Sequence, residues 1–321
     1  MTILTPDVLA ILILDFIFLF FSFIALILSF RIVLRWDITK STPLQYSLEK
    51  ESYLVATIIK YIFVLKIPLF LFFIFTLDKL SNVIPGAMCA AGVVNATVYG
   101  FYLLILKIIN LYLFGFWLLL HHFDMKREDY AFVKIKFWLF IFIFFPFLIE
   151  IILEVLMFYN INPAKIVSCC GTLFSAAKSS SISSLMKLPH FLVVGAFYAN
   201  FFLILLFYLL KRDFFFALFN FTFLFISILS LISFFSTYVY ELPTHHCPFC
   251  LLQKDYYYVG YFLYIFLFIG TFFGMANAFI KIFIKRRISI WYNLSLIFNT
   301  FYVILITIYP IVYYIKNGVW L

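Results

Sequence analysis

The chain has 321 residues, of which 66% are hydrophobic and 12% are charged. Soluble proteins carry about 45–50% apolar and about 25% charged residues, so this composition excludes a soluble globular fold. The formal net charge of +9 would suggest nucleic acid as the partner of a soluble chain. In a membrane protein the same lysines and arginines set the orientation of the loops, and we expect no nucleic-acid partner.

Eight apolar segments follow one another along the chain, and each is long enough to cross about 30 Å of hydrocarbon. They lie at 9–34, 53–77, 97–120, 135–159, 190–210, 213–240, 256–284 and 289–315. Only helices and closed barrels satisfy their backbone hydrogen bonds in lipid, and continuous runs of this length predict helices. The sequence therefore predicts an all-α, polytopic protein with about eight transmembrane helices in a lipid bilayer. No basic residue precedes the first apolar run, so we expect no cleaved signal peptide.

The basic residues predict the orientation of these spans. One set of alternate loops carries fourteen lysines and arginines, and the opposite set carries six. The positive-inside rule places the richer set in the cytoplasm and both termini outside the cytoplasm. In this arrangement all five cysteines lie on the extracytoplasmic side, where disulfides form and persist. They are Cys89, Cys169, Cys170, Cys247 and Cys250.

Ionisable residues inside the predicted spans are costly in lipid and need partners. Lys107 lies in the third span, and Glu150 and Glu154 lie four residues apart on one face of the fourth. At a rise of about 1.5 Å per residue, Lys107 and Glu150 reach a similar depth, where neighbouring spans could pair them. Asp15 and Lys66 are further candidates, although Lys66 could instead snorkel to the surface. The pattern indicates either a proton or ion path, or an ion pair that locks helices together.

The longest outer loop, at 160–189, contains the run NINPAKIVSCCG with Cys169 and Cys170. Its Ser-rich continuation spaces apolar residues in a way that suits an interfacial half-helix. Cys89 lies in a different outer loop, in the run IPGAMCAAGV. Because the number of cysteines is odd, at least one thiol has no disulfide partner within the chain.

The run HHCPFCLLQK, at 245–254, carries two cysteines with CxxC spacing just ahead of the seventh span. Two thiols at this spacing can close a disulfide. We expect Cys247 to lie at the N-terminus of the helix, which would lower the pKa of its thiol and favour the reactive thiolate. Pro248 would pre-set the first helical turn. The motif indicates either thiol–disulfide exchange or an inert disulfide that clips the loop.

Two histidines adjoin this motif and permit a second interpretation. His245, His246 and the two thiols are ligands that suit Cu(I) or Zn²⁺. The four residues are too close in sequence to bind one ion comfortably, so Cys169, Cys170 or His190 would have to complete the site. Alternatively, the histidines tune the thiols, because a nearby imidazolium favours the thiolate. The remaining two histidines end the third span on the opposite side, so no haem bridging both sets is expected.

The order of these elements resembles that of a known family. From residue 135 the chain reads as a span, an outer loop with NINPAKIVSCCGTLFS, a span starting LPHFLVVG, a further span, and HHCPFC opening the next. This order is similar to that of the vitamin K epoxide reductase family of membrane thiol oxidoreductases, over roughly residues 135–285. The stretch CPFCLLQK also resembles the CxxC region of the disulfide bond protein B family.

The resemblance implies roles for the cysteines. Cys247 and Cys250 would pass electrons to a membrane quinone, and Cys169 or Cys170 would exchange with the thiols of a substrate or of a thioredoxin-like partner. Cys89 would be an accessory thiol. The family's two loop cysteines are well separated, whereas Cys169 and Cys170 are adjacent. The resemblance also implies a multi-pass protein of the cell inner membrane.

The resemblance divides the chain into three parts. Residues 1–134 would form an N-terminal helical part, 135–285 the family-like four-helix part, and 286–321 an extra C-terminal helix. Two other functions agree with the same residues. One is a membrane protein that handles copper or another metal through the HHCPFC and CC ligands. The other is a non-catalytic subunit whose cysteines only staple loops.

Overall fold

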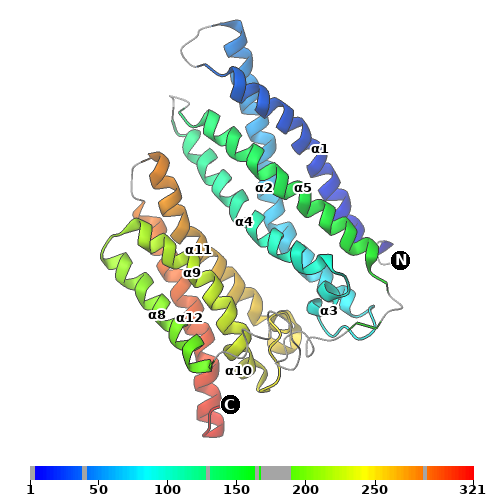
Figure 1. The fold of residues 1–321 in the computed structure, drawn as a ribbon, viewed down its shortest axis with the longest axis vertical. Coiled ribbons are helices and arrows are strands. Elements are labelled where there is room, and N and C mark those ends of the chain that lie inside the picture. Colours follow the sequence, from blue (N-terminus) through cyan, green and yellow to red (C-terminus); the bar gives the residue numbers. More distant parts are fainter. Residues whose placement is uncertain (1–3, 38–41, 128–130, 163–165, 168–188, 285–287) are drawn as a thin grey trace. The chain divides into compact units, whose positions relative to one another are not determined.

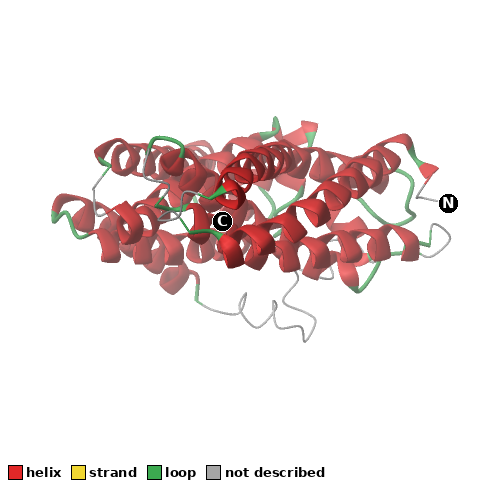
Figure 2. Ribbon diagram, turned by 90° about the horizontal axis from the view of Figure 1, so that it is seen from above, coloured by secondary structure: helices red, strands yellow, loops and turns green. Residues whose placement is uncertain are grey.

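The structure, a computed structural model, describes residues 4–37, 42–127, 131–162, 166–167, 189–284 and 288–321. These residues form helices, turns and loops, and no strand occurs among them (Figure 2). Eight helices are long and apolar enough to cross a membrane, which confirms the predicted number of spans. The half-helix expected in the Ser-rich part of the longest loop lies outside the described residues.

The chain divides into two compact units, and their boundaries differ from those expected. Unit 1 comprises Met1–Val83 and Val94–Lys165, and unit 2 comprises Ile84–Val93 and Ile166–Leu321. The fourth span, expected to begin the second part, packs with the first and third spans and belongs to unit 1. The last span, expected to stand apart, packs on the seventh within unit 2. The units therefore follow packing partners, whereas the expected parts followed the family resemblance.

Unit 1 is a bundle of four long helices. They are α1 (Pro6–Arg35), α2 (Pro43–Ser81), α4 (Tyr99–Asp124) and α5 (Val133–Asn160). The short α3 (Ala90–Asn95) precedes α4 in the chain, and its first four residues belong to unit 2. Helix α1 packs against α2 and α5, and α4 packs against the same two helices, which closes the bundle (Figure 1). Prolines in the first turns of α1 and α2 suit positions where the backbone N–H needs no partner.

Large aromatic side chains fill the interior of unit 1, and others cover its outside. Phe63 stacks on Phe114 with ring centroids 4.4 Å apart and meets the edge of Trp117 at 5.4 Å. Phe16 and Phe20 on α1 are 57% and 64% exposed, as lipid-facing side chains are. Lipid chains are as apolar as these side chains, so packing and polar contacts, more than hydrophobic burial, hold such helices together.

Unit 2 contains the other four spans. They are α8 (His190–Leu209), a span built from α9 (Asp213–Ser230), the π-helical turn η2 (Leu231–Phe235) and α10 (Ser236–Tyr240), then α11 (Val259–Ile284) and α12 (Ser289–Asn317). Helix α9 packs against α8 and α11, and α12 packs against α11 and α8 (Figure 1). The loop between α10 and α11 holds two short 3₁₀ turns, η3 (Cys250–Leu252) and η4 (Lys254–Tyr256).

Two glycines one helical turn apart bring α11 close to its neighbours. A Cβ on Gly270 would lie 2.1 Å from Oδ1 of Asn299, and a Cβ on Gly274 would lie 2.2 Å from Cγ of Asn220. The two asparagines are fully buried, and Nδ2 of Asn299 donates to Oδ1 of Asn220 at 2.7 Å. Small residues that admit a polar neighbour are a common way to join helices in membranes. This contact ties α9, α11 and α12 together.

Candidate functional site

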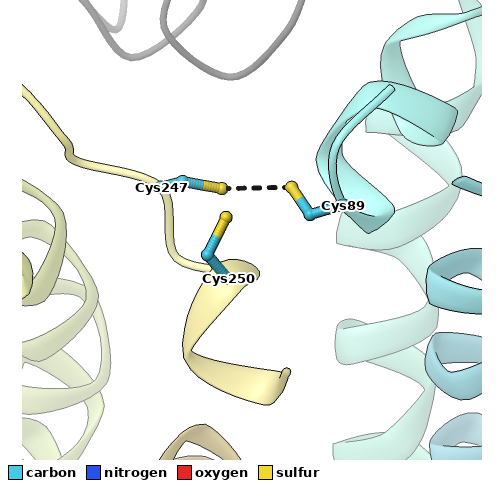
Figure 3. Close-up of side chains that lie close together, drawn as sticks. All are labelled: Cys89, Cys247 and Cys250. Carbon is cyan, nitrogen blue, oxygen red and sulfur yellow. Dashed lines mark hydrogen bonds between the residues drawn. The ribbon is translucent and has the colours of Figure 1, made fainter. Parts of the chain in front are cut away.

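Three cysteines from two separate segments of unit 2 meet at one place. Cys89 lies in the loop just ahead of α3, Cys247 lies in the loop after α10, and Cys250 begins η3. The Sγ atoms of Cys89 and Cys247 are 3.6 Å apart, and all three sulfurs lie within 4.8 Å of one another. Figure 3 shows the three sulfurs pointing toward one another. We call these residues the thiol centre.

The sulfurs of the thiol centre are buried, and no disulfide bond joins any two of them. Cys89, Cys247 and Cys250 are 0%, 0% and 5% exposed, and none of them forms a disulfide. A disulfide bond is about 2.05 Å long, so the 3.6 Å contact is that of two neighbouring thiols. A shift of about 1.5 Å would be enough to join them. The centre can therefore exchange a disulfide internally or present three sulfur ligands to one ion.

Two tyrosine hydroxyls from α10 and α11 hold the CxxC loop. The hydroxyl of Tyr240, at the end of α10, donates to the backbone carbonyl of Cys247. The hydroxyl of Tyr264, in the second turn of α11, donates to the carbonyl of Pro248 at 2.6 Å. Both helices thus restrain the backbone that carries the first thiol. Sequence reasoning missed these two residues, because nothing in the pattern separates them from the chain's other tyrosines.

The segment that carries Cys89 is attached to the same loop and to the loop after α5. Nε2 of Gln253 donates to the carbonyl of Met88 at 3.0 Å. The N–H of Val167 donates to the carbonyl of Pro85 at 3.0 Å. Gly86 has a φ of 86°, and a Cβ there would lie 2.3 Å from the carbonyl oxygen of Val167. Only glycine accommodates this turn, which places Cys89 against the CxxC loop.

The predicted position of the CxxC motif at a helix N-terminus is wrong. Cys247 lies in non-helical backbone, Cys250 begins a 3₁₀ turn, and α11 begins only at Val259. Tyr257 and Tyr258 adopt left-handed backbone conformations, with φ of 53° and 57°, and separate the loop from the helix. The N-terminus of α11 therefore does not provide the expected stabilisation of the Cys247 thiolate. Cys169 and Cys170 lie outside the described residues.

The two adjacent histidines face different neighbours. The ring of His245 meets the ring of Tyr240 edge-on at 4.3 Å, and its Nε2 is buried without a hydrogen-bond partner among the described atoms. Nδ1 of His246 lies 3.0 Å from the carbonyl of Ile232, which belongs to η2. A π-helical turn changes the usual backbone pairing, and such turns are frequent at functional sites. The π-helical turn thus supplies an acceptor for His246.

Neither His190 nor the adjacent histidines complete the group of three sulfurs. His190 is exposed at the start of α8, with its ring 6.0 Å from that of Phe234. Among the residues that the structure describes, no imidazole nitrogen lies within 4.8 Å of all three sulfurs. The expected ligand set was HHCPFC completed by Cys169, Cys170 or His190, whereas in the observed group Cys89 joins the two CxxC thiols. A soft metal ion bound at this place would have three sulfur ligands.

Burial lowers the pKa of His245 and of His246 below the ordinary value of 6.5. At neutral pH both imidazoles are therefore largely uncharged. They cannot supply the positive charge through which they were expected to stabilise a thiolate. A neutral imidazole can instead accept a proton from a thiol.

This shift predicts that acid destabilises the loop. As the pH falls through about 6.5, the two imidazoles take up protons in the unfolded chain but remain neutral in the folded loop. Their effect on the free energy of unfolding is therefore absent above that pH, and stability declines below it. We expect the midpoint temperature of thermal unfolding to decrease as the pH is lowered from about 7 to about 5. A His245→Gln/His246→Gln variant should lose part of that dependence, as measured by tryptophan fluorescence in nanodiscs. An equally steep decline in the variant would contradict the assignment.

The close approach of α11 to η3 predicts a second effect. A Cβ on Gly260 would lie 2.9 Å from the backbone carbon and the Cβ of Leu251, within η3. Gly260→Ala should therefore displace the turn that carries Cys250 and cost about 1–3 kcal/mol of stability. We also expect faster alkylation of Cys250, measured by mass spectrometry. Gly195→Ala is the matched control, because a Cβ there meets nothing within 4 Å. Equal labelling rates in the two variants would contradict this packing.

The ionisable residues predicted inside the spans meet within unit 1. Nζ of Lys107 lies 2.9 Å from Oε1 of Glu150 and 2.7 Å from Oε2 of Glu154, which confirms the expected pairing. Nζ of Lys66 lies 2.9 Å from Oδ1 of Asp15 and 2.9 Å from Oε1 of Glu150. Lys66 is 4% exposed, so it does not snorkel to the surface. All four long helices of unit 1 contribute to this charge cluster.

One polar partner in the charge cluster was missed. Nδ2 of Asn110 donates to Oε2 of Glu150 at 2.6 Å and to the carbonyl of Pro146 at 3.2 Å. Asn110 lies three residues after Lys107, so the two side chains share one face of α4. That three-residue spacing is visible in the sequence and could have identified Asn110 as a member of the cluster.

The chain was compared with protein-family models, with curated proteins and with solved structures, and none of the three comparisons finds a match. The resemblance to the vitamin K epoxide reductase family therefore depends on the order of spans and cysteines alone. A function for the chain has to be argued from the thiol centre and its chemistry.

Proposed function

We propose that the protein is an integral membrane thiol–disulfide oxidoreductase that passes electrons from extracytoplasmic thiols to a membrane quinone. The observation that carries this proposal is the thiol centre, in which Cys89 contacts Cys247 and both lie within 4.8 Å of Cys250. In our proposal both termini are extracytoplasmic, and the membrane is the cell inner membrane. The fourteen-to-six asymmetry of basic residues supports this orientation.

Three adjacent sulfurs allow a disulfide to move without any external reagent. When Cys247 and Cys250 are joined, the thiolate of Cys89 can attack Sγ of Cys247. A bond forms between Cys89 and Cys247, the bond to Cys250 breaks, and Cys250 leaves as a thiolate that takes up a proton. No electrons are gained or lost in this exchange. Net oxidation of two thiols to a disulfide releases two electrons and two protons.

A bound quinone would supply the chemistry of a two-electron, two-proton acceptor. Two tyrosine rings lie beside the thiol centre. Tyr240 and Tyr256 pack edge to face with centroids 4.6 Å apart, and Tyr240 also contacts the backbone of Cys247. Because the sulfurs are buried, they suit an electron acceptor that arrives through lipid. A thiol on another protein could react only with an exposed cysteine.

Substrate thiols need a more accessible cysteine than those of the thiol centre. The hydrogen bond from Val167 to Pro85 holds the start of the longest loop against the segment that carries Cys89. Cys169 and Cys170 follow Val167 in the sequence by two and three residues. We propose that they are the thiols that exchange with a thioredoxin-like partner and pass the disulfide to Cys89 and Cys247.

The test is a mass measurement on the full-length protein in nanodiscs. The reduced protein is incubated with a short-chain quinone and then alkylated, and the alkyl groups on each cysteine are counted. We expect quinone to remove two alkylation sites at the thiol centre and a dithiol to restore them. Cys89, Cys247 and Cys250 that remain alkylated with and without quinone would exclude redox catalysis and favour a non-catalytic subunit.

A metal-handling function is the second candidate, and the geometry of the three sulfurs favours it specifically. With metal–sulfur bonds of about 2.3 Å, ligand sulfurs lie about 4 Å apart, close to the separations in the thiol centre. The buried Nε2 of His245, which has no partner among the described atoms, is a further potential donor nearby. Stoichiometric copper or zinc in the purified protein, lost in Cys247→Ser, would support this function over quinone reduction.

A further inference from the structure

The charge cluster of unit 1 contains more acid than base. Its members are Asp15 on α1, Lys66 on α2, Lys107 on α4, and Glu150 and Glu154 on α5. Each is at most 5% exposed. With every group ionised, three carboxylates face two ammonium groups, and the cluster carries one negative charge. An uncompensated charge at this depth in lipid is costly.

Hydrogen bonding in the cluster has the same imbalance. Oδ2 of Asp15, Oε1 of Glu154 and Oδ1 of Asn110 are buried and accept no hydrogen bond from any described residue. Asp15, Glu154 and Asn110 are all fully buried. All three orphaned atoms are oxygens in acceptor positions, so the cluster lacks a donor or a cation. The charge count and the orphaned oxygens independently indicate one missing positive charge.

The contacts of the lysines identify which cation fits. The ammonium groups of Lys66 and Lys107 both lie 2.9 Å from Oε1 of Glu150. Two ammonium groups on one carboxylate oxygen would repel a divalent ion strongly at such distances. One oxygen each of Asp15, Glu150 and Glu154 lies within 4.8 Å of the others. A single proton satisfies the charge and needs no further space.

A small cavity adjoins the cluster. It has a volume of about 10 Å³, room for about one water molecule, and is lined by Lys66, Lys107 and Glu150 together with apolar side chains of α2 and α4. Asp15 lies nine residues after the start of α1, so the cluster is about 14 Å along the helix from that end. A water molecule in this cavity would contact the cluster and could pass it a proton.

We propose that the charge cluster is a proton-binding site within the membrane, in which Asp15 and Glu154 share one proton. The protonated carboxyl donates to an orphaned oxygen of the other, and the two lysines neutralise the remaining two carboxylates. The site is independent of the thiol centre. Reversible protonation of a buried carboxyl is the chemistry by which membrane proteins couple proton movement to other work.

The test is infrared spectroscopy of the full-length protein in nanodiscs at about pH 7, with choline chloride as the salt. We expect a protonated-carboxyl stretching band that shifts in D₂O. Glu154→Gln should remove it, and this variant should fold because its cluster has two carboxylates and two ammonium groups. Glu241→Gln is the matched control, since Glu241 forms an exposed pair with Lys316 and should leave the band unchanged.

Two outcomes would overturn the proposal. Absence of the band in the folded wild-type protein would mean that all three carboxylates are ionised. A band that survives in Glu154→Gln and in Asp15→Asn would assign the proton to another group. Replacing choline by sodium separates a proton from an alkali ion. A sodium-independent band supports the proton, whereas stabilisation by sodium with no band at all would identify sodium as the occupant and overturn the proposal.

Discussion

Replacement of Lys107 by methionine is expected to lower the free energy of unfolding by about 3–5 kcal/mol. The ammonium group contacts both Glu150 and Glu154 within 3 Å and lies 4.5 Å from the ring centre of Phe73. Methionine keeps the apolar stem but leaves two buried carboxyl groups without their shared cation. The measurement is unfolding in mixed micelles, followed by tryptophan fluorescence.

Two matched variants separate lost charge from lost packing. In Lys107→Met/Glu150→Gln the cluster keeps Lys66 and the carboxyl groups of Asp15 and Glu154. With the proposed proton shared by these two carboxyls, one negative charge faces one ammonium group, so most of the stability should return. Lys316→Met removes an exposed pair and should change stability little. If the double variant is as unstable as the single one, the loss comes from packing around residue 107 rather than from the unpaired carboxylates.

Replacement of Cys247 by serine should abolish oxidation of the thiol centre by quinone. Cys247 is the sulfur that contacts Cys89 and shares the CxxC motif with Cys250, so both internal disulfides need it. We expect quinone-dependent loss of thiols to fall by more than about a hundredfold, as for removal of an essential nucleophile. The measurement is the rate of quinol formation with a small dithiol as the electron donor.

The neighbouring cysteines provide the controls for this variant. Cys89→Ser should leave the Cys247–Cys250 disulfide able to form, so a small dithiol should still reduce quinone while transfer from a protein partner is lost. Each serine variant should keep the thermal unfolding midpoint of the wild type within a few degrees. A Cys247→Ser protein that forms quinol at the wild-type rate would remove the thiol centre from the proposed function.

The number of spans and the pairing within unit 1 were predictable from the sequence. Apolar runs of helix length leave lipid as the only environment that tolerates them, and all eight predicted spans correspond to helices. Lys107 and Glu150 were expected at similar depth, and their ammonium and carboxylate groups do meet at 2.9 Å. Helical rise is uniform, so residue numbers convert directly into depth.

The partner of the CxxC motif was not predictable, nor was the local conformation of the motif. Cys89 and Cys247 are separated by 158 residues, and no local pattern indicates which outer loop reaches the other. The motif was expected to open a helix, yet the left-handed Tyr257 and Tyr258 separate it from α11. Such a break depends on contacts that only the folded chain supplies. In this loop they are the hydrogen bond from Gln253 to Met88 and those from two tyrosine hydroxyls.

The sequence by itself determined that the chain is a multi-pass helical membrane protein with ionisable groups inside its spans and thiols in its loops. The composition and the length of the apolar runs suffice for this conclusion, because only helices and closed barrels satisfy their backbone hydrogen bonds in hydrocarbon. The tertiary structure decided that Cys89 joins Cys247 and Cys250, and that five ionisable side chains from four helices form one cluster. Contacts between residues far apart in sequence depend on how whole helices and loops pack, and no window of the sequence encodes them.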